Sequence, residues 1–282
     1  MRSFAHWLRS LPAAFAFAAI LPVSAHAFER VQTAPKSELL ENCPGLVSWK
    51  APRPIPASLR LAALSADQVR ITYAGHSTFL IESPQLLRIA TDYNDWVKPP
   101  VLPDLITMNH AHSSHYTERP DPAIKHVLRG WAGGEQPARH DLHVKDVRIR
   151  NVPTNIRDWG GGTERHGNSI FIFEIGSLCV AHLGHLHHTL SQQQLNEIGR
   201  VDVVLVPVDG SYTLDMEGMM EVLGALKARL MIPMHAFSTS TLNRFVELAR
   251  QKYEVQFADT PSVVVSRSTL PAQPQLLVLP GR

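Results

Sequence analysis

Residues 104–115 read DLITMNHAHSSH, a hydrophobic strand pattern that runs directly into three histidines. Alternate positions at an extended strand end face the same side, so His110 and His112 are placed to bind one metal ion together. His115 follows after the chain turns and is placed to reach a second ion. Neutral imidazole is a ligand for zinc and related metals. The stretch therefore predicts a metal site at the end of a strand.

Two later strand patterns also end in histidine. Residues 178–188 read LCVAHLGHLHH, where Gly184 permits a tight turn between His182 and His185. The segment LMIPMH ends at His235. Three strand ends that carry histidine are what a metal site at the edge of a sheet requires. The alternative, in which each histidine has a separate structural role, explains a single residue better than it explains the group.

The rest of the chain alternates strand-like runs with helical segments. The runs are rich in Val, Ile, Leu and Phe and are bounded by Gly, Pro, Asn or Asp. They lie at 69–82, 86–91, 105–108, 144–152, 169–175, 178–182, 203–208, 231–234, 255–257 and 263–266. Helices are expected at about 191–198, after Asp215, and at about 241–252. Strands followed by strand–helix alternation predict an α/β fold of layered sheets covered by helices.

Composition excludes several classes of protein. The 282 residues are 44% hydrophobic and 18% charged, which suits a folded core and not a disordered chain. With 27 Lys and Arg against 25 Asp and Glu, the formal charge of +2 does not suit a nucleic-acid-binding protein. Sixteen Gly, two Cys and the lack of heptads exclude collagen, coiled-coil and disulfide-scaffold classes. Histidine is unusually abundant, at 15 residues.

The first 27 residues have the pattern of a secretory signal peptide. Arg2 and Arg9 precede an apolar run at 11–23, and the sequence AHA at 25–27 forms a small-x-small cleavage site. The apolar run of about 13 residues is too short for a membrane anchor, because a bilayer span needs roughly 20. We expect cleavage after Ala27 and a periplasmic or secreted protein. Loss of the two Arg leaves 25 basic and 25 acidic residues, a formally neutral mature chain.

Three further parts are expected behind this segment. Residues 28–65 are proline-rich and are interpreted as a wrapping N-terminal arm. Residues 66–270 contain no repeat or low-complexity linker and are interpreted as one domain, with 271–282 as a C-terminal tail. Cys43 and Cys179 reach an oxidising compartment after export, where they either form a disulfide or stay separate thiols.

Taken in order, the histidine motifs resemble those of the metallo-beta-lactamase superfamily, in its ascorbate-phosphate-lactonase-like branch. The resemblance covers roughly residues 69–260. The family's His-x-His-x-Asp-His motif falls on 110–115, its His-Leu-Gly-Asp motif on 182–185, and its final Pro-Met-His on 233–235. The resemblance implies the metallo-beta-lactamase fold, a four-layer αββα sandwich with metals at the sheet edges.

The same resemblance implies a ligand set and a reaction. His110, His112 and His182 would hold a first metal, and His115 and His235 would help to hold a second. A metal-bound water, with its pKa brought toward neutrality, would attack an ester, lactone, amide or phosphodiester. We therefore predict an exported metal-dependent hydrolase of a small-molecule substrate. The expected cofactor is one or two zinc ions (Zn²⁺), with manganese and iron as alternatives.

Two positions depart from the family pattern. Ser114 stands where the family has an Asp that binds the second metal, and His185 stands where it has a bridging Asp. An imidazole offers a metal one free nitrogen, whereas a carboxylate offers two oxygens. Three arrangements stay open: one ion, two ions with His185 as a terminal ligand, or a second ion that recruits another carboxylate. Asp209 is the candidate for that carboxylate, and a turn-forming Asp-Gly is the alternative interpretation.

Each candidate site residue thus has an expected role. The predicted catalytic residues are His115 and Asp209. The predicted metal ligands are His110, His112, His115, His182, His185 and His235. Asp92 and Ser114 are expected behind these ligands, and turn capping is the alternative for Asp92. Further candidates are His76, for structural hydrogen bonding or substrate contact, and His187 and His188, for lining the pocket or for packing or capping the helix that begins at Ser191.

Two alternatives to an exported hydrolase remain. The first is a non-catalytic or degenerate periplasmic metal-binding protein of the same fold, which the loss of both acidic ligands motivates. The second is a nuclease, as in other branches of the superfamily. The neutral mature chain and the export signal argue against a nuclease, although Arg157 and Arg165 flank a glycine-rich loop at 160–162. No motif encodes the oligomeric state.

Overall fold

The computed structural model describes residues 64–133, 136–158 and 160–281. The chain divides into two units, Met1–Lys36 and Ser37–Arg282, and the first unit lies outside the described residues. The predicted signal peptide and all but the last residues of the predicted arm lie outside them as well. Within the described ranges, no helix is long and apolar enough to cross a membrane.

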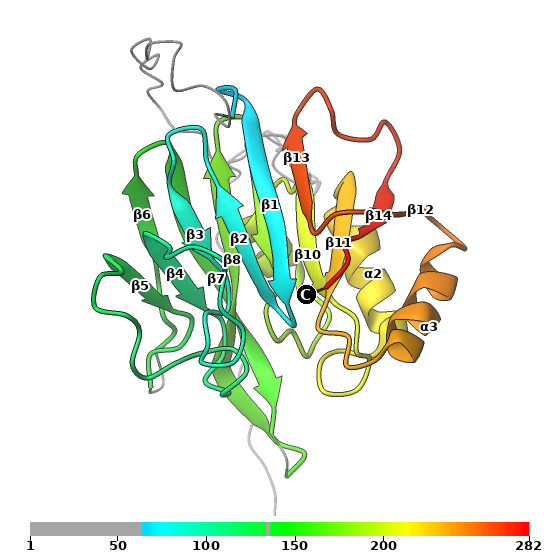
Figure 1. Ribbon diagram of the computed structural model, residues 1–282. Helices are drawn as coiled ribbons and strands as arrows, with labels where there is room; N and C mark the ends of the chain where they lie inside the picture. Colours follow the sequence, from blue (N-terminus) through cyan, green and yellow to red (C-terminus); the bar gives the residue numbers. More distant parts are fainter. Residues whose placement is uncertain (1–63, 134–135, 159, 282) are drawn as a thin grey trace, which may run out of the picture. The chain divides into compact units, whose positions relative to one another are not determined.

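A first sheet is formed by six strands (Figure 1). They are β1 (Gln68–Gly75), β2 (Thr78–Glu82), β3 (Arg88–Ala90), β4 (Leu105–Met108), β5 (His126–Arg129) and β13 (Ser262–Ser266). Their order in the sheet is β13-β1-β2-β3-β4-β5. The single run expected at 69–82 is a hairpin of two antiparallel strands, β1 and β2. The pairs β3–β4 and β4–β5 are parallel, so the sheet is mixed.

Eight further strands make the second sheet. They are β6 (Asp141–Val144), β7 (Val147–Arg157), β8 (Thr163–Ile175), β9 (Leu178–His182), β10 (Val203–Pro207), β11 (Leu230–Met234), β12 (Glu254–Phe257) and β14 (Gln275–Val278). Their order is β12-β14-β11-β10-β9-β8-β7-β6. The tail expected at 271–282 is therefore wrong for β14, which lies between β11 and β12. This strand forms because Leu276 and Val278 are buried in the core.

The two sheets face each other across one apolar core. Ile71, Phe79 and Ile89 enter it from the first sheet, and Phe171 and Phe173 enter it from the second. All five side chains are fully buried. Neighbouring strand residues point to opposite faces, so the isoleucine between Phe171 and Phe173 faces the helices, and this part of β8 is buried on both sides. Burying each such side chain contributes about 1.5–3 kcal/mol.

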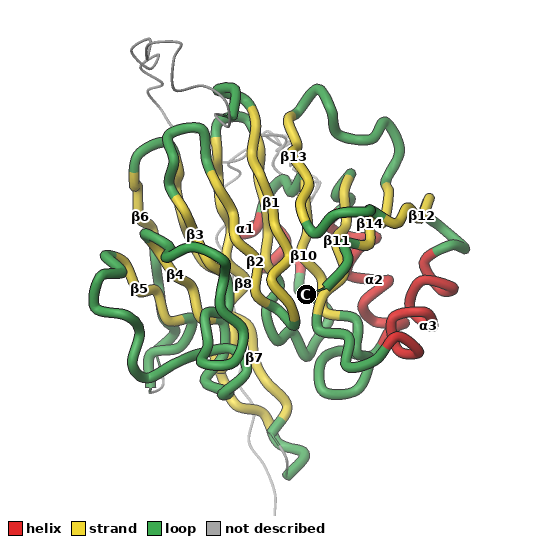
Figure 2. Tube along the Cα trace, viewed as in Figure 1, coloured by secondary structure: helices red, strands yellow, loops and turns green. Residues whose placement is uncertain are grey.

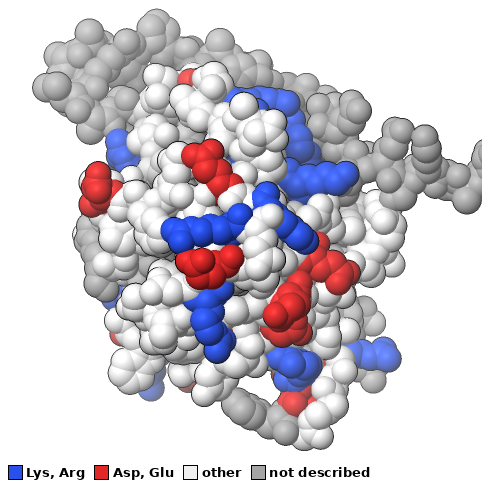
Figure 3. All heavy atoms as spheres, turned by 90° about the vertical axis from the view of Figure 1, so that its right-hand side faces the viewer, with Lys and Arg blue, Asp and Glu red and all other residues white. Residues whose placement is uncertain are grey.

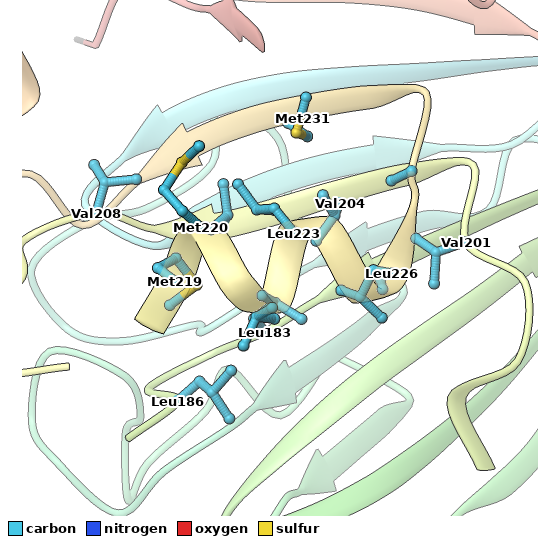
Figure 4. Close-up of a cluster of buried hydrophobic side chains, with 14 of the residues drawn as sticks. Leu183, Leu186, Val201, Val204, Val208, Met219, Met220, Leu223, Leu226 and Met231 are labelled. Carbon is cyan, nitrogen blue, oxygen red and sulfur yellow. The ribbon is translucent and has the colours of Figure 1, made fainter. Parts of the chain in front are cut away.

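Three helices were expected and all three are present, as α1 (Gln192–Ile198), α2 (Met216–Leu226) and α3 (Thr239–Ala249). Ser191 and Gln194 form the capping box that starts α1, and Asp215 caps α2. The helices pack on the second sheet, on the face that points away from the first (Figure 2). Figure 4 shows Met219 and Leu223 of α2 directed at this sheet. The methionine stripe of α2 is therefore core packing.

The outer face of the first sheet is covered differently. Among the described residues it carries no helix, and a smaller apolar cluster lies there instead. The cluster consists of Ala90, Tyr93, Ile106, Met108 and Ile124, with Tyr116, Val127 and Trp131 packed against it. The predicted α/β fold of two packed sheets is thus confirmed, and its helices lie on the second sheet.

Cys179 lies in β9 and is fully buried. It is disulfide-bonded, so the alternative of a separate thiol is excluded for this residue. Cys43, the other cysteine of the sequence, lies outside the described residues.

The edges of the two sheets meet where the histidines lie. Strands β9, β10 and β11 are parallel, so their carboxyl ends lie at one edge of the second sheet. The backbone N–H of His235, just after β11, donates to the carbonyl of His76 in the β1–β2 turn over 2.7 Å. His110, just after β4, forms a bridge to Asn168 of β8. These contacts bring residues that are distant in sequence to one site.

Candidate metal centre

His115 is the most connected histidine of the cluster and is fully buried. Its Nδ1 lies 2.6 Å from Asp92 Oδ2. Its Nε2 lies 3.1 Å from His235 Nε2 and 3.0 Å from His185 Nδ1. Burial, and then the charge of His235, lower the pKa of His115 well below its usual range. The ring is therefore neutral, donates its Nδ1–H to Asp92, and keeps a lone pair on Nε2.

Asp92 lies behind His115 and accepts the hydrogen of its Nδ1. Its side chain is fully buried, and its Oδ1 accepts the backbone N–H of Asn109 over 2.8 Å. Burial raises the pKa of Asp92. A cation held by the neighbouring imidazoles would offset this penalty and favour the carboxylate. The buried carboxylate of Asp92 is thus better suited to a site that holds a cation than to a site without one.

His235 is held in the same way by Asp209. Its Nδ1 lies 2.9 Å from Asp209 Oδ1, and Asp209 Oδ2 accepts backbone N–H groups from Ser211, Tyr212 and Thr213. Burial opposes ionisation of Asp209, but hydrogen bonds from His235 and Thr213 outweigh it and lower the pKa of Asp209 below its usual range. Both carboxylate oxygens are engaged, which favours support of His235 over direct ligation of a second ion.

The donor set at this point fits a divalent cation. Because carboxylates fix Nδ1–H on both rings, the Nε2 atoms of His115 and His235 face each other with lone pairs, and these repel unless a proton or a cation lies between them. Nitrogen ligands at about 2.0–2.1 Å from a tetrahedral zinc are separated by about 3.3 Å, close to the separations observed here. Carboxylate–histidine pairs are also the usual means of orienting metal-binding imidazoles.

His76 joins this group although the sequence did not predict it as a ligand. Its ligand atom lies within 4.8 Å of those of His115 and His235. Its Nε2 is buried and has no hydrogen-bond partner among the described residues. Burial lowers its pKa to about 4, so the ring is neutral. In the sequence, the only signal for His76 was its place in a Gly-His-Ser turn. In the structure this turn follows β1, and the φ of His76 is 50°.

His110 and His112 lie beside both His115 and His185. The His110 Nδ1 lies 2.7 Å from the carbonyl of Gly167, and its ring stacks on His185 at a centroid distance of 5.1 Å. His112 Nδ1 lies 3.0 Å from Ser114 Oγ. The rings of His110 and His112 are 6.2 Å apart and nearly parallel. The structure thus brings the predicted pair together, with Ser114 bonded to one of its rings.

His182 takes a different position. It is fully buried, its Nε2 lies 2.9 Å from the carbonyl of Ser77, and its ring meets Phe79 edge-on. In the described part of the chain no ring contact joins His182 to His110 or His112. Its Nδ1 is buried without a partner there. The proposed trio of ligands for a first metal therefore stays a prediction.

The cluster opens into a cavity of about 930 Å³. His110, His112, His185 and His235 form one part of its lining, and the rest includes Ile156, Arg157, His187, Tyr212 and Phe237. Tyr212 and Phe237 are both about half exposed and meet edge-on at 5.2 Å. The cavity therefore joins the imidazole nitrogens of the cluster to an aromatic rim.

His187 lines this cavity, as the sequence suggested, and does not cap α1, whose cap is Ser191. Its Nδ1 accepts the backbone N–H of Arg157 over 2.9 Å. Burial lowers the pKa of His187 to about 4. His188 does not belong to the lining of this cavity. The two neighbouring histidines therefore have different surroundings.

Comparison with known proteins places these features in a family. Residues 70–235 match the family model described as a Beta-lactamase superfamily domain. The chain is 23% identical over 221 residues to a UPF0173 metal-dependent hydrolase of Archaeoglobus fulgidus, a match that covers 70% of this chain and 96% of that protein. It is 25% identical over 190 residues to a UPF0173 metal-dependent hydrolase of Thermoplasma acidophilum, covering 60% and 84% of the two chains.

Solved structures of other proteins have a similar fold. A Thermotoga maritima protein, described as belonging to the Zn-dependent hydrolases of the metallo-beta-lactamase superfamily, matches with a TM-score of 0.56 and 28% identity, over 76% of this chain and all of that one. The metallo hydrolase Igni18 of Ignicoccus hospitalis shares the fold, with a TM-score of 0.50 and 21% identity over 65% of this chain and 91% of that one. The chain described here has the same two mixed sheets, with histidines at their edges. Together with the matched residues, this shows that it belongs to the metallo-beta-lactamase superfamily.

Proposed function

We propose that this protein is a metal-dependent hydrolase whose ion is held by His115, His185 and His235, with His76 beside them. One observation carries the proposal: His115 Nε2 lies 3.0–3.1 Å from a ring nitrogen of both His185 and His235. The relatives are named metal-dependent hydrolases, which supports the proposal. Zinc is the proposed metal because the donors are imidazoles, and manganese and iron are the alternatives.

A bound divalent ion supplies Lewis-acid chemistry, since it polarises a substrate oxygen and lowers the pKa of water. The chain's own residues prepare the site. Asp92 and Asp209 hold the Nδ1–H of His115 and His235 and so direct both Nε2 atoms inward. His110 donates its Nδ1–H to the carbonyl of Gly167, so its Nε2 carries the lone pair that can accept a proton from the reacting group.

The proposed substrate is a small molecule with an ester, lactone, amide or phosphodiester bond. The half-exposed aromatic pair Tyr212 and Phe237 at the cavity suits a substrate with an apolar or planar group. A nuclease is not favoured, because the chain without residues 1–27 has equal numbers of basic and acidic residues. Figure 3 shows both signs of charge interspersed on one face of the molecule. The finer assignment to the ascorbate-phosphate-lactonase-like branch is part of the proposal.

We further propose that the mature protein begins after Ala27 and acts in the periplasm or outside the cell. The pattern of residues 1–27 supports this, and so does the disulfide bond at Cys179, because disulfides persist in oxidising compartments. Fractionation of cells that express the full chain, with sequencing of the mature N-terminus, tests it. A cytoplasmic protein that retains residues 1–27 would refute export.

The competing candidate is a metal-binding protein of this fold without turnover. Ser114 favours it, since this residue bonds to His112 and offers no carboxylate to an ion. The test is to purify the mature protein without added metal, measure its metal content, and assay it against ester, lactone, amide and phosphodiester panels before and after loading with zinc. Turnover that depends on zinc supports the hydrolase. Bound zinc without turnover on any panel supports the binding protein.

A further inference from the structure

We infer that His187 presents its Nε2–H as a hydrogen-bond donor to an oxygen atom of the substrate in the cavity beside the histidine cluster. The inference rests on the proposed hydrolase function and deepens it. It names the chemistry that the site recognises beyond the metal, which is an oxygen acceptor such as a carbonyl, carboxylate or phosphoryl oxygen.

The tautomer of His187 is fixed by the main chain. The backbone N–H of Arg157 donates to His187 Nδ1 over 2.9 Å. A nitrogen that accepts a hydrogen bond must carry a lone pair, so the hydrogen of the ring is on Nε2. No side-chain proton at Arg157 can move to reverse this arrangement, since the donor is an amide. His187 is therefore a donor, and not an acceptor, at its second nitrogen.

The backbone that sets this tautomer is itself held. Arg157 is the last residue of β7, and its guanidinium donates to the carbonyl of Thr213 over 2.8 Å. Thr213 belongs to the loop whose N–H groups bind Asp209, the carboxylate behind His235. One rigid frame thus positions both the donor of His187 and one candidate metal ligand, which is what a preorganised site requires.

The Nε2 of His187 has no partner in the described part of the chain, and it is buried. The residue is only 7% exposed, yet it belongs to the lining of the cavity of about 930 Å³. Leaving a buried donor unpaired is unfavourable, and nearly all buried donors are paired. A residue that lines the cavity and carries a buried donor without a partner in the described chain is thus suited to an acceptor that a ligand brings.

The position of His187 also matches this role. Its ring lies 4.8 Å from the ring of His185, a proposed metal ligand. A substrate oxygen next to the ion would therefore lie within reach of the neighbouring donor. The guanidinium of Arg157 is turned toward the carbonyls of Ser211 and Thr213, which leaves the neutral imidazole as the donor nearer the cluster. A neutral donor suits both a carbonyl oxygen and the negative charge that develops on it during hydrolysis.

The test uses the mature chain and two matched substitutions at His187. His187→Phe keeps the ring and removes the donor, whereas His187→Gln keeps an N–H donor at a similar distance. His188→Phe is the control, because the Nε2 of His188 is also buried without a partner in the described residues but His188 is not part of the cavity lining. Thermal unfolding and zinc content of each variant show whether the fold and the metal site are kept.

Two measurements then decide. Nitrogen-15 spectra of histidine-labelled protein, with His187 assigned by its absence in His187→Gln, should show the hydrogen on Nε2. Titration of zinc-loaded protein with inorganic phosphate, followed by calorimetry, should give binding that is about tenfold weaker in His187→Phe, as loss of about 1.4 kcal/mol predicts. His187→Gln and His188→Phe should stay within about threefold of the unmodified protein.

Hydrogen on Nδ1, or phosphate binding that is absent or unchanged in His187→Phe, would overturn the inference. A failure of the proposed function looks different. In that case the protein binds phosphate with the dependence on His187 described above but hydrolyses none of the panels. Loss of zinc in His187→Phe with normal zinc in His187→Gln would also count against a donor to substrate, because it would make His187 part of the metal site.

Discussion

The Nε2 atoms of His115 and His235 lie 3.1 Å apart, although the Nδ1 of each ring is already bound to a buried carboxylate. Two neutral rings in these tautomers have no hydrogen to share between them. The residues come from loops after β4 and β11, which belong to different sheets. A pair of carboxylate-backed imidazoles that meet in this way is best satisfied by a cation.

The first prediction concerns metal affinity. His115→Ala removes the nitrogen shared by both short contacts, and we expect zinc affinity to fall by roughly 100-fold or more, since one of three ligands is lost. Competition with a chromophoric chelator measures this directly. His126→Ala, on β5, is the matched control and should bind zinc as the unmodified protein does. Equal affinity in both variants would place the ion elsewhere.

A second prediction separates ligation by His76 from mere packing. His76→Phe keeps a ring against His235, where the two rings now lie 4.2 Å apart, but it removes the buried unpartnered nitrogen. We expect zinc affinity to fall by about 10–100-fold, the range seen when supporting groups of a metal site are lost. Cobalt-substituted protein gives an independent readout, because its visible spectrum changes with the number of ligands. An unchanged spectrum would exclude His76 from the coordination sphere.

Asp209 gives a prediction about pH. Burial opposes its ionisation, but hydrogen bonds outweigh burial and depress its pKa in the folded chain below the ordinary 3.8. A depressed folded pKa stabilises the protein above the unfolded value, and this contribution is lost as pH falls from about 4 toward the folded value. Asp209→Asn should therefore lower the free energy of unfolding of the zinc-free protein more at pH 7 than at pH 3. Urea denaturation at both values tests this, and an equal loss at the two pH values would contradict it.

Gly184 gives a prediction about stability. Its φ is +61°, and a Cβ at this position would overlap the side chain of Asn109, whose Nδ2 donates to the carbonyl of Ser169. Gly184→Ala should destabilise the fold by at least about 1–3 kcal/mol from backbone conformation alone and should displace His185. The glycine control is Gly224→Ala in α2, where a Cβ meets nothing within 4 Å and a small gain in stability is expected. Thermal unfolding and zinc content distinguish the two.

Local signals in the sequence were sufficient for much of the fold. Capping residues marked the start of α1 and α2, and apolar runs bounded by Gly, Pro, Asn or Asp marked strands that enter the core. Strand β14 was missed because its four residues lie between prolines at 274 and 280 and read as an irregular tail. Its formation depends on a slot between β11 and β12 that no local pattern reveals.

The residue types of the candidate site could be predicted from the sequence, but the contacts among these residues could be predicted less well. Histidine at the ends of β9 and β11 could be read directly, since the ends of parallel strands share an edge. The approach of His76 to His235 could not be predicted, because it depends on how the two sheets pack. The sequence also could not reveal that Asp209 binds His235 with one oxygen and three backbone amides with the other.

A cation between His115 and His235 would do more than chemistry, because these residues are 120 positions apart in the chain. Joining them closes a long loop, and the entropy that such a closure removes from the unfolded chain grows with the logarithm of loop length. The ion would then act as a reversible cross-link between the two sheets, with part of its binding energy spent on holding them together. A low metal concentration would thus shorten the lifetime of the folded protein, as well as reduce turnover.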